Sequence, residues 1–152
     1  MKKQKLILDQ VERSLQSMSH LSDLIIPGSG WIHSIRQALG MSLRQLGKRM
    51  NITPQSVNEI ETREKNGTVS INVLRQVASA LNMKLVYGFI PKNGSLESMI
   101  EEKAAELAAM IVRRTSASML LEDQENSEER LKKAIDEKIT EIKQTMPKYL
   151  WD

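Results

Sequence analysis

Four neighbouring residues in the middle of the chain, Thr53, Pro54, Gln55 and Glu59, have side chains that can contact the base edges of duplex DNA. Gln can form a bidentate pair of hydrogen bonds with adenine, and Glu can accept a hydrogen bond from the amino group of cytosine. The methyl group of Thr can pack against the methyl group of thymine. Gln55 and Glu59 are four residues apart, so in a helix they share one face. This chemistry requires elements that present that face to a groove.

A second set of polar residues suits contacts with phosphate groups, which fix the register of a protein on DNA without reading its sequence. This set is Ser42, Arg44, Ser56, Asn58, Arg63 and Lys65. The net charge of +3 is unevenly distributed, because residues 1–92 carry 13 Lys or Arg against 6 Asp or Glu, whereas residues 93–152 carry 9 against 13. The basic part suits a polyanion, and the acidic part is expected to face another protein or a second copy of the chain.

The stretch Leu43–Thr62 predicts the two short helices that such a surface needs, joined by a tight turn. Asn51 suits a left-handed backbone in the turn, Thr53 can cap the second helix, and Pro54 suits its first position. Gly47 lies where the helices approach, so a side chain larger than methyl is expected to hold them apart. These features favour a helix-turn-helix that binds double-stranded DNA. A scaffold of two helices without a ligand is the alternative. The expected inner residues are Leu46, Met50, Ile52, Val57 and Ile60.

The whole sequence predicts a mainly α-helical protein with a helix-turn-helix domain, one short β-strand and a C-terminal helical hairpin. The expected parts are an N-terminal helical extension (1–26, with a helix over 4–18), the helix-turn-helix domain (31–82), a strand that can serve in a dimer (83–92) and the hairpin (95–150). Within the domain we expect a helix from Trp31 to Leu39 that buries Ile32, Ile35 and Leu39, a capping box of Ser42 with Gln45, a loop from Arg63 to Val69, and a helix capped by Ser70.

The segment Lys84–Ile90 is rich in β-branched and aromatic residues and therefore predicts a strand. A lone strand cannot satisfy its own backbone groups. Pairing with the same segment of a second copy would give a symmetric dimer. The alternative is a strand-like run packed on the helices, with its edge open to water or covered by a loop.

Two amphipathic patterns predict the hairpin. Ser95 can cap a helix from Leu96 to Leu121, whose middle, Ala104–Val112, is apolar on more than one face. Ser127 can cap a last helix, which is expected to pack antiparallel to the first. Its apolar stripe consists of Leu131, Ile135, Ile139, Ile142 and Met146.

Composition argues against several other function classes. The chain has no Cys, and its two His residues, His20 and His33, lack partners at metal-ligand spacing. Glu101, Glu102 and Glu106 have no nearby His or Cys and are interpreted as a solvated helix face. We therefore expect no enzyme, no metal and no cofactor. No segment has the length of a signal peptide or a membrane span, which predicts a cytoplasmic protein that does not enter the membrane.

Residues 31–81 resemble the phage-repressor or XRE-type helix-turn-helix family, a compact four- to five-helix domain. In that family an Arg of the first helix commonly pairs with a Glu at the end of the recognition helix. Arg36 and Glu61 occupy the matching positions, so the resemblance implies a structural ion pair. The sequence departs from the family at Leu43, where many relatives have a Gln that contacts phosphate.

A wider resemblance covers roughly residues 5–125 and rests on the runs GWIHSIRQALGMS, GTVSINVLRQVASALNMKLVYGFIP and RRTSASMLLEDQ. These runs resemble the bacterial family called mobile mystery protein A, whose members are typically encoded beside a Fic-domain protein, mobile mystery protein B. The resemblance implies a toxin–antitoxin-like or autoregulatory pair. Ser118 and Glu122 have the spacing of an inhibitory motif of Fic antitoxins, although Asp123 follows. An ordinary helix end is the alternative.

These observations together predict a homodimeric transcriptional regulator, a repressor that reads a palindromic operator through the helix Pro54–Glu61. The alternative is an antitoxin-like protein that binds and neutralises a Fic-domain partner.

Overall fold

The computed structural model describes residues 2–120 and 128–152, without the side chains of residues 118–120. The expected Ser118–Glu122 motif and the Ser127 cap lie outside the described residues. The chain divides into two compact units, one formed by Leu21–Gly88 and the other by Met1–His20 with Phe89–Asp152. A short 3-10 helix, Ser19–Asp23, lies at the first boundary between them.

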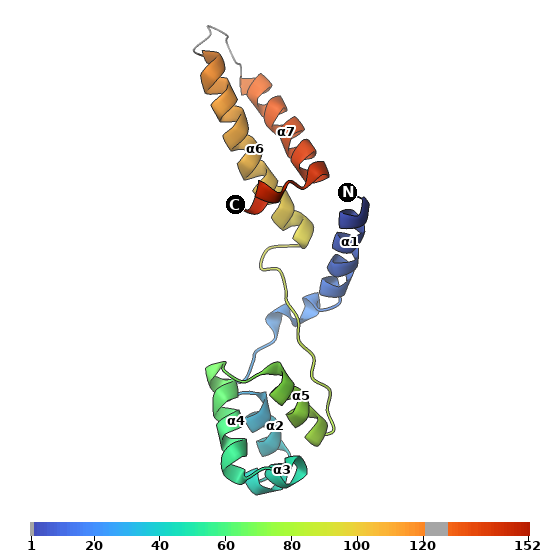
Figure 1. The fold of residues 1–152 in the computed structure, drawn as a ribbon, viewed down its shortest axis with the longest axis vertical. Helices are drawn as coiled ribbons and strands as arrows, with labels where there is room; N and C mark the ends of the chain where they lie inside the picture. The colour runs from blue at the N-terminus through green and yellow to red at the C-terminus, as the bar shows by residue number, and fades with distance from the viewer. Residues whose placement is uncertain (1, 121–127) are drawn as a thin grey trace. The chain divides into compact units, whose positions relative to one another are not determined.

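The Leu21–Gly88 unit is a cluster of four helices around one small core (Figure 1). The helices are α2 (Trp31–Ala38), α3 (Leu43–Met50), α4 (Pro54–Asn66) and α5 (Ile71–Ala80). Each of α2 to α5 contributes one buried apolar side chain to the core, in order Ile32, Leu46, Val57 and Val77. The expected apolar residues Met50, Ile52 and Ile60 are partly buried against this core. The sequence pattern therefore identified most of this core correctly, whereas Ile35, which was expected to be buried, is half-buried.

Two details of this unit differ from expectation. Leu39 is 60 % exposed rather than buried, because α2 ends at Ala38 and Gly40 turns the chain away with φ of +62°. The loop expected from Arg63 to Val69 is also wrong, since α4 continues to Asn66 and ends at Gly67 in the left-handed conformation. Basic side chains in the last turn of α4 favour this extension, because they face the negative end of the helix dipole. Ser70 caps α5 as expected, with its Oγ 3.2 Å from the N–H of Val73.

The strand expected at Lys84–Ile90 is wrong: the described residues contain no β-strand. The segment forms no backbone hydrogen bond with another described residue, so it lacks the ladder that defines a strand. Val86, Tyr87 and Phe89 are exposed, the last by 83 %. The Tyr87 side chain makes a cation–π contact with α5, because the guanidinium carbon of Arg75 lies 5.9 Å from the centre of its ring. β-Propensity alone therefore did not produce a strand, because no described segment of the chain pairs with these residues.

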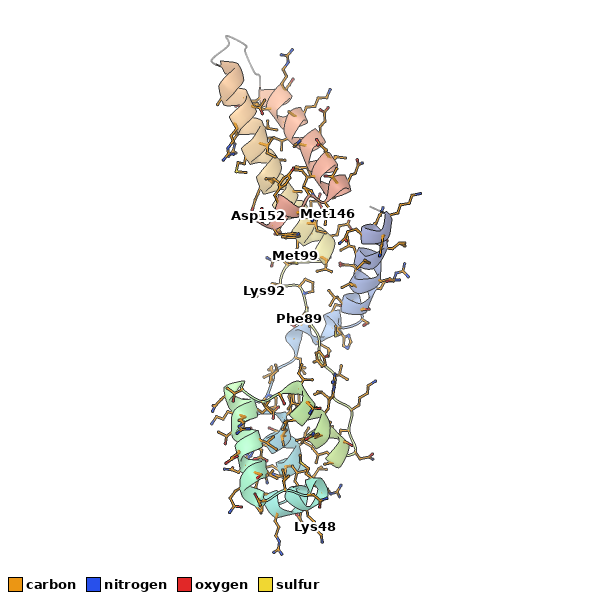
Figure 2. All side chains as sticks on the ribbon, in the orientation of Figure 1. Lys48, Phe89, Lys92, Met99, Met146 and Asp152 are labelled. Atoms are coloured by element: carbon orange, nitrogen blue, oxygen red, sulfur yellow. The ribbon has the colours of Figure 1, made fainter. Side chains whose placement is uncertain are left out.

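The second unit is built on an antiparallel hairpin of α6 (Leu96–Leu120) and α7 (Glu128–Thr145), which lie side by side in Figure 1. This confirms the predicted helical hairpin. Ala104 and Ala108 of α6 are fully enclosed beside Ile142 of α7, so small residues allow the two helices to approach closely. Met146, which Figure 2 labels, packs against the same core. Ile135 and Ile139, two other residues of the predicted apolar stripe of α7, also pack against it.

Two further elements complete this unit. A 3-10 helix, Lys148–Trp151, places Leu150 in the core, which the sequence did not predict. The N-terminal helix α1 (Lys2–Gln16) packs Leu8 against that core and contacts α6. The start of α6 has two caps: Ser95 Oγ accepts from the N–H of Ser98 at 3.1 Å, and Glu12 Oε2 of α1 accepts from the N–H of Leu96 at 3.0 Å. None of the described helices is both long and apolar enough to cross a bilayer.

Candidate nucleic-acid interface

The turn between α3 and α4 has the geometry that the sequence predicted. Ser42 and Gln45 form the expected capping box at the start of α3, with hydrogen bonds of 3.1 and 2.8 Å. Asn51 adopts the left-handed conformation, with φ of 57° and ψ of 40°. Thr53 Oγ1 accepts a hydrogen bond of 3.1 Å from the N–H of Ser56, and Pro54 is the first residue of α4. Local chemistry therefore fixes where α3 ends and where α4 begins.

Gly47 allows the turn to lie directly on α3. A Cβ atom at this position would be 2.7 Å from the carbonyl oxygen of Ile52 and 3.4 Å from a methyl group of Val57. The expectation that only a side chain larger than methyl is excluded is therefore wrong, because even a methyl group requires the turn backbone to shift. The obstacle is a backbone atom of the turn, which the apolar pattern of the two helices does not reveal.

The residues expected to contact bases lie on the open side of α4. Val57 and Glu61 are buried, whereas Thr53, Pro54, Gln55 and Glu59 are exposed. Among the described residues, neither Gln55 nor Glu59 has a side-chain hydrogen-bond partner, so their polar groups are available to a ligand. At about 100° per residue, these two side chains project from the face opposite Val57. Their donors and acceptors match those that read adenine and cytosine in the major groove.

The residues expected to contact phosphates lie on both sides of this face. Ser56 and Arg63 are about two turns apart along one flank, and Asn58 and Lys65 are similarly spaced along the other. Two rows of donors on either side of a base-reading face suit the two phosphate backbones that border a groove. Part of this set is already engaged, since Ser56 Oγ lies 2.9 Å from Thr53 Oγ1. The remaining two members, Ser42 and Arg44, lie at the N-terminal end of α3.

Arg36 of α2 and Glu61 of α4 form a nearly enclosed ion pair beneath the interface. Their side chains are 12 % and 6 % exposed, and Arg36 Nε and Nη2 donate to the two carboxylate oxygens at 2.5 and 3.2 Å. Arg36 Nη1 also donates to the carbonyl oxygen of Met41 at 2.9 Å. His33, which the sequence interpretation left without a role, lies with Nδ1 3.1 Å from Glu61 Oε2. Nδ1 of His33 also lies 3.3 Å from Arg36 Nη2, so the imidazole contacts both members of the pair.

The environment of the pair keeps both partners charged. Burial by itself raises the pKa of Glu61, but the hydrogen bonds and the charge attraction from Arg36 and His33 together outweigh burial, so the pKa lies below its ordinary value. The hydrogen bond to Glu61 raises the pKa of Arg36. The charged pair therefore connects α2 to α4, and neither group points toward the exposed face of α4.

The structure also explains the departure from the XRE-type pattern at Leu43. This side chain is partly buried against the core formed by Ile32, Leu46, Val57 and Val77. Leu43 thus contributes apolar packing at the position where the resemblance implied a polar side chain.

Sequence reasoning missed Glu64, which it placed in a loop. The carboxylate of Glu64 accepts hydrogen bonds from the backbone N–H groups of Trp31 and Ile32, at 3.1 and 2.8 Å. A signal was present at Gly30, because a helix that starts after Gly has no local side chain to satisfy its first N–H groups.

No group of three or more possible metal-ligating residues occurs among the described residues.

Comparison with known proteins assigns one part of the chain. Residues 32–87 match a family model described as helix-turn-helix. The match supports the resemblance of this part of the chain to XRE-type helix-turn-helix domains. No curated protein and no solved structure matches the chain.

Proposed function

We propose that this protein is a sequence-specific transcriptional regulator that binds double-stranded DNA through the N-terminal half of α4. The observation that carries the proposal is the pair Gln55 and Glu59, exposed and without hydrogen-bond partners among the described residues, on the second helix of a matched helix-turn-helix domain. Phosphate contacts from the two flanks of α4 would hold this face in the groove. A regulator of this kind works as a repressor in the cytoplasm by occupying its operator, without catalysis.

The proposed regulator is a homodimer that reads a two-fold symmetric operator, with recognition helices about 34 Å apart. The exposed apolar side chains of Val86, Tyr87 and Phe89 support association of two copies, because one chain leaves them open to water. Two identical protomers would also place the three cations of the phosphate set, Arg44, Arg63 and Lys65, on both half-sites.

Selection of bound sequences from a random duplex library, followed by titration across a salt series, tests this proposal. An enriched palindrome supports a dimeric reader. If the six cations of a dimer each neutralise one phosphate, log K falls with log salt with a slope of about −5, against about −3 for a single protomer. Binding that selects no sequence would contradict base reading by Gln55 and Glu59.

A second candidate function concerns the other unit. Tyr149 and Trp151 are each 54 % exposed, and aromatic residues of this kind are enriched at protein–protein interfaces. Together with the resemblance to mobile mystery protein A, this surface supports an antitoxin-like role in which the chain binds a Fic-domain partner. Co-purification of the two proteins tests the role, with Tyr149→Ala/Trp151→Ala as the variant expected to lose the partner. Retention of the partner by that variant would exclude this surface.

A further inference from the structure

Helix α4 is fastened to α2 by two acidic side chains that lie one turn apart. Glu61 binds the side chains of Arg36 and His33, as described above. Among the described residues, Glu64 binds the backbone of α2 alone, through the first two N–H groups of that helix. The second attachment is therefore independent of the first, and it acts at the end of α2 that has no cap of its own.

The structure around Gly30 is adapted to this attachment. Gly30 has φ of +89°, and a Cβ atom there would lie 2.6 Å from Glu64 Oε1. A residue with a side chain at position 30 would therefore push the carboxylate away from the helix terminus. The absence of a side chain at Gly30 leaves room for the carboxylate of Glu64. This carboxylate takes the place that the side chain of a Ser, Thr, Asp or Asn cap has in other helices.

The position of Glu64 on α4 links this contact to the base-facing surface. Gln55 and Glu64 are nine residues apart, which is about two and a half helical turns, so they project from opposite sides of the helix. Any rotation of α4 about its axis moves both side chains together. A fixed contact on the inner side therefore determines which groups the outer side presents to a groove.

We propose that Glu64 is a positioning residue, which sets the rotation of α4 and thereby the ability of Gln55 and Glu59 to discriminate between base pairs. This inference rests on the proposed function. It predicts that loss of the Glu64 contact impairs discrimination rather than DNA binding in general, because the flanking phosphate contacts carry no sequence information.

The measurement is the ratio of affinities for the selected operator and for a random duplex, at a temperature where each protein is folded. In Glu64→Ala the ratio is expected to fall about tenfold, the size of losing one base contact. Ser70→Ala is the control, because it removes the side-chain cap of another helix of the same unit, and the hydrogen bond that it removes lies at the start of α5. Its discrimination ratio should remain that of the wild type.

Two further variants separate position from charge. Glu64→Gln loses the same charge as Glu64→Ala but keeps an amide oxygen that can accept from α2, so it should recover part of the ratio. Gly30→Ala keeps the charge but displaces the carboxylate and strains the backbone at φ of +89°, so it should lower the ratio, and it should lower it less in a Glu64→Ala background, where only the strain remains. A Glu64→Ala protein with wild-type discrimination would overturn the inference. A wild-type protein that selects no operator would instead overturn the proposed function.

Discussion

Removal of the Glu61 carboxylate is expected to destabilise the helix-turn-helix unit severely. In Glu61→Ala the enclosed guanidinium of Arg36 keeps two neutral contacts, the carbonyl oxygen of Met41 at 2.9 Å and Nδ1 of His33 at 3.3 Å, and loses its only described anionic partner. Breaking a buried ion pair by removing one partner costs about 3–5 kcal/mol, because a charge is left buried without compensation. A domain of this size loses about 4–8 °C in Tm per kcal/mol, so Tm should fall by more than about 12 °C.

The distribution of Trp residues allows this unit to be followed separately. Trp31 starts α2, whereas Trp151 belongs to the other unit, and the chain has no further Trp. Unfolding of a Trp151→Phe background by heat and by urea can therefore be followed through Trp31 fluorescence. Glu59→Ala is the control, because Glu59 is an exposed Glu of the same helix and its loss should change stability by less than about 0.5 kcal/mol.

The double replacement Arg36→Met/Glu61→Leu tests the stated cause. With both charges removed and similar volume retained, this variant should be more stable than Glu61→Ala. Unchanged unfolding in Glu61→Ala would refute the assignment of a buried stabilising pair. A double variant less stable than Glu61→Ala would refute the argument that the uncompensated Arg36 charge causes the loss.

Four other changes give distinct outcomes. Because the pKa of Glu61 is lowered in the folded state, its carboxylate stabilises the fold fully above pH 4.5, the ordinary pKa, and loses this effect as pH falls through the folded pKa. In Glu61→Gln the urea midpoint should therefore depend less on pH in the acid range. Gln55→Ala should cost about 1–3 kcal/mol on the selected operator and relax specificity there, and equal loss on random DNA would exclude base reading. Arg63→Ala should reduce the slope of log K against log salt by about 1 per protomer and leave the base preference unchanged, which titrations on several sequences would measure. Gly47→Ala should destabilise the unit by about 1–3 kcal/mol in chemical denaturation, because its methyl group meets the Ile52 carbonyl, and wild-type stability would show that the turn yields freely.

The parts of the fold that depend on neighbouring residues in the chain followed from the sequence. The Ser42 capping box, the left-handed Asn51 and the Thr53 cap each involve groups within a few residues, so short motifs specify them. The helical hairpin followed from apolar periodicity, because each helix must bury its own stripe. The pairing of Arg36 with Glu61 was implied by family resemblance, since no spacing rule connects residues on different helices.

The parts that depend on distant residues were decided only by tertiary structure. Sequence alone determined that a helix starts at Trp31, but not that Glu64 of α4 would supply the acceptor for its first N–H groups. It likewise determined that Lys84–Ile90 favours extended backbone, but a strand exists only where another segment completes its hydrogen bonds. Helix caps and turns close within a few residues of chain, whereas attachments between helices and strand pairing require groups that folding alone brings together.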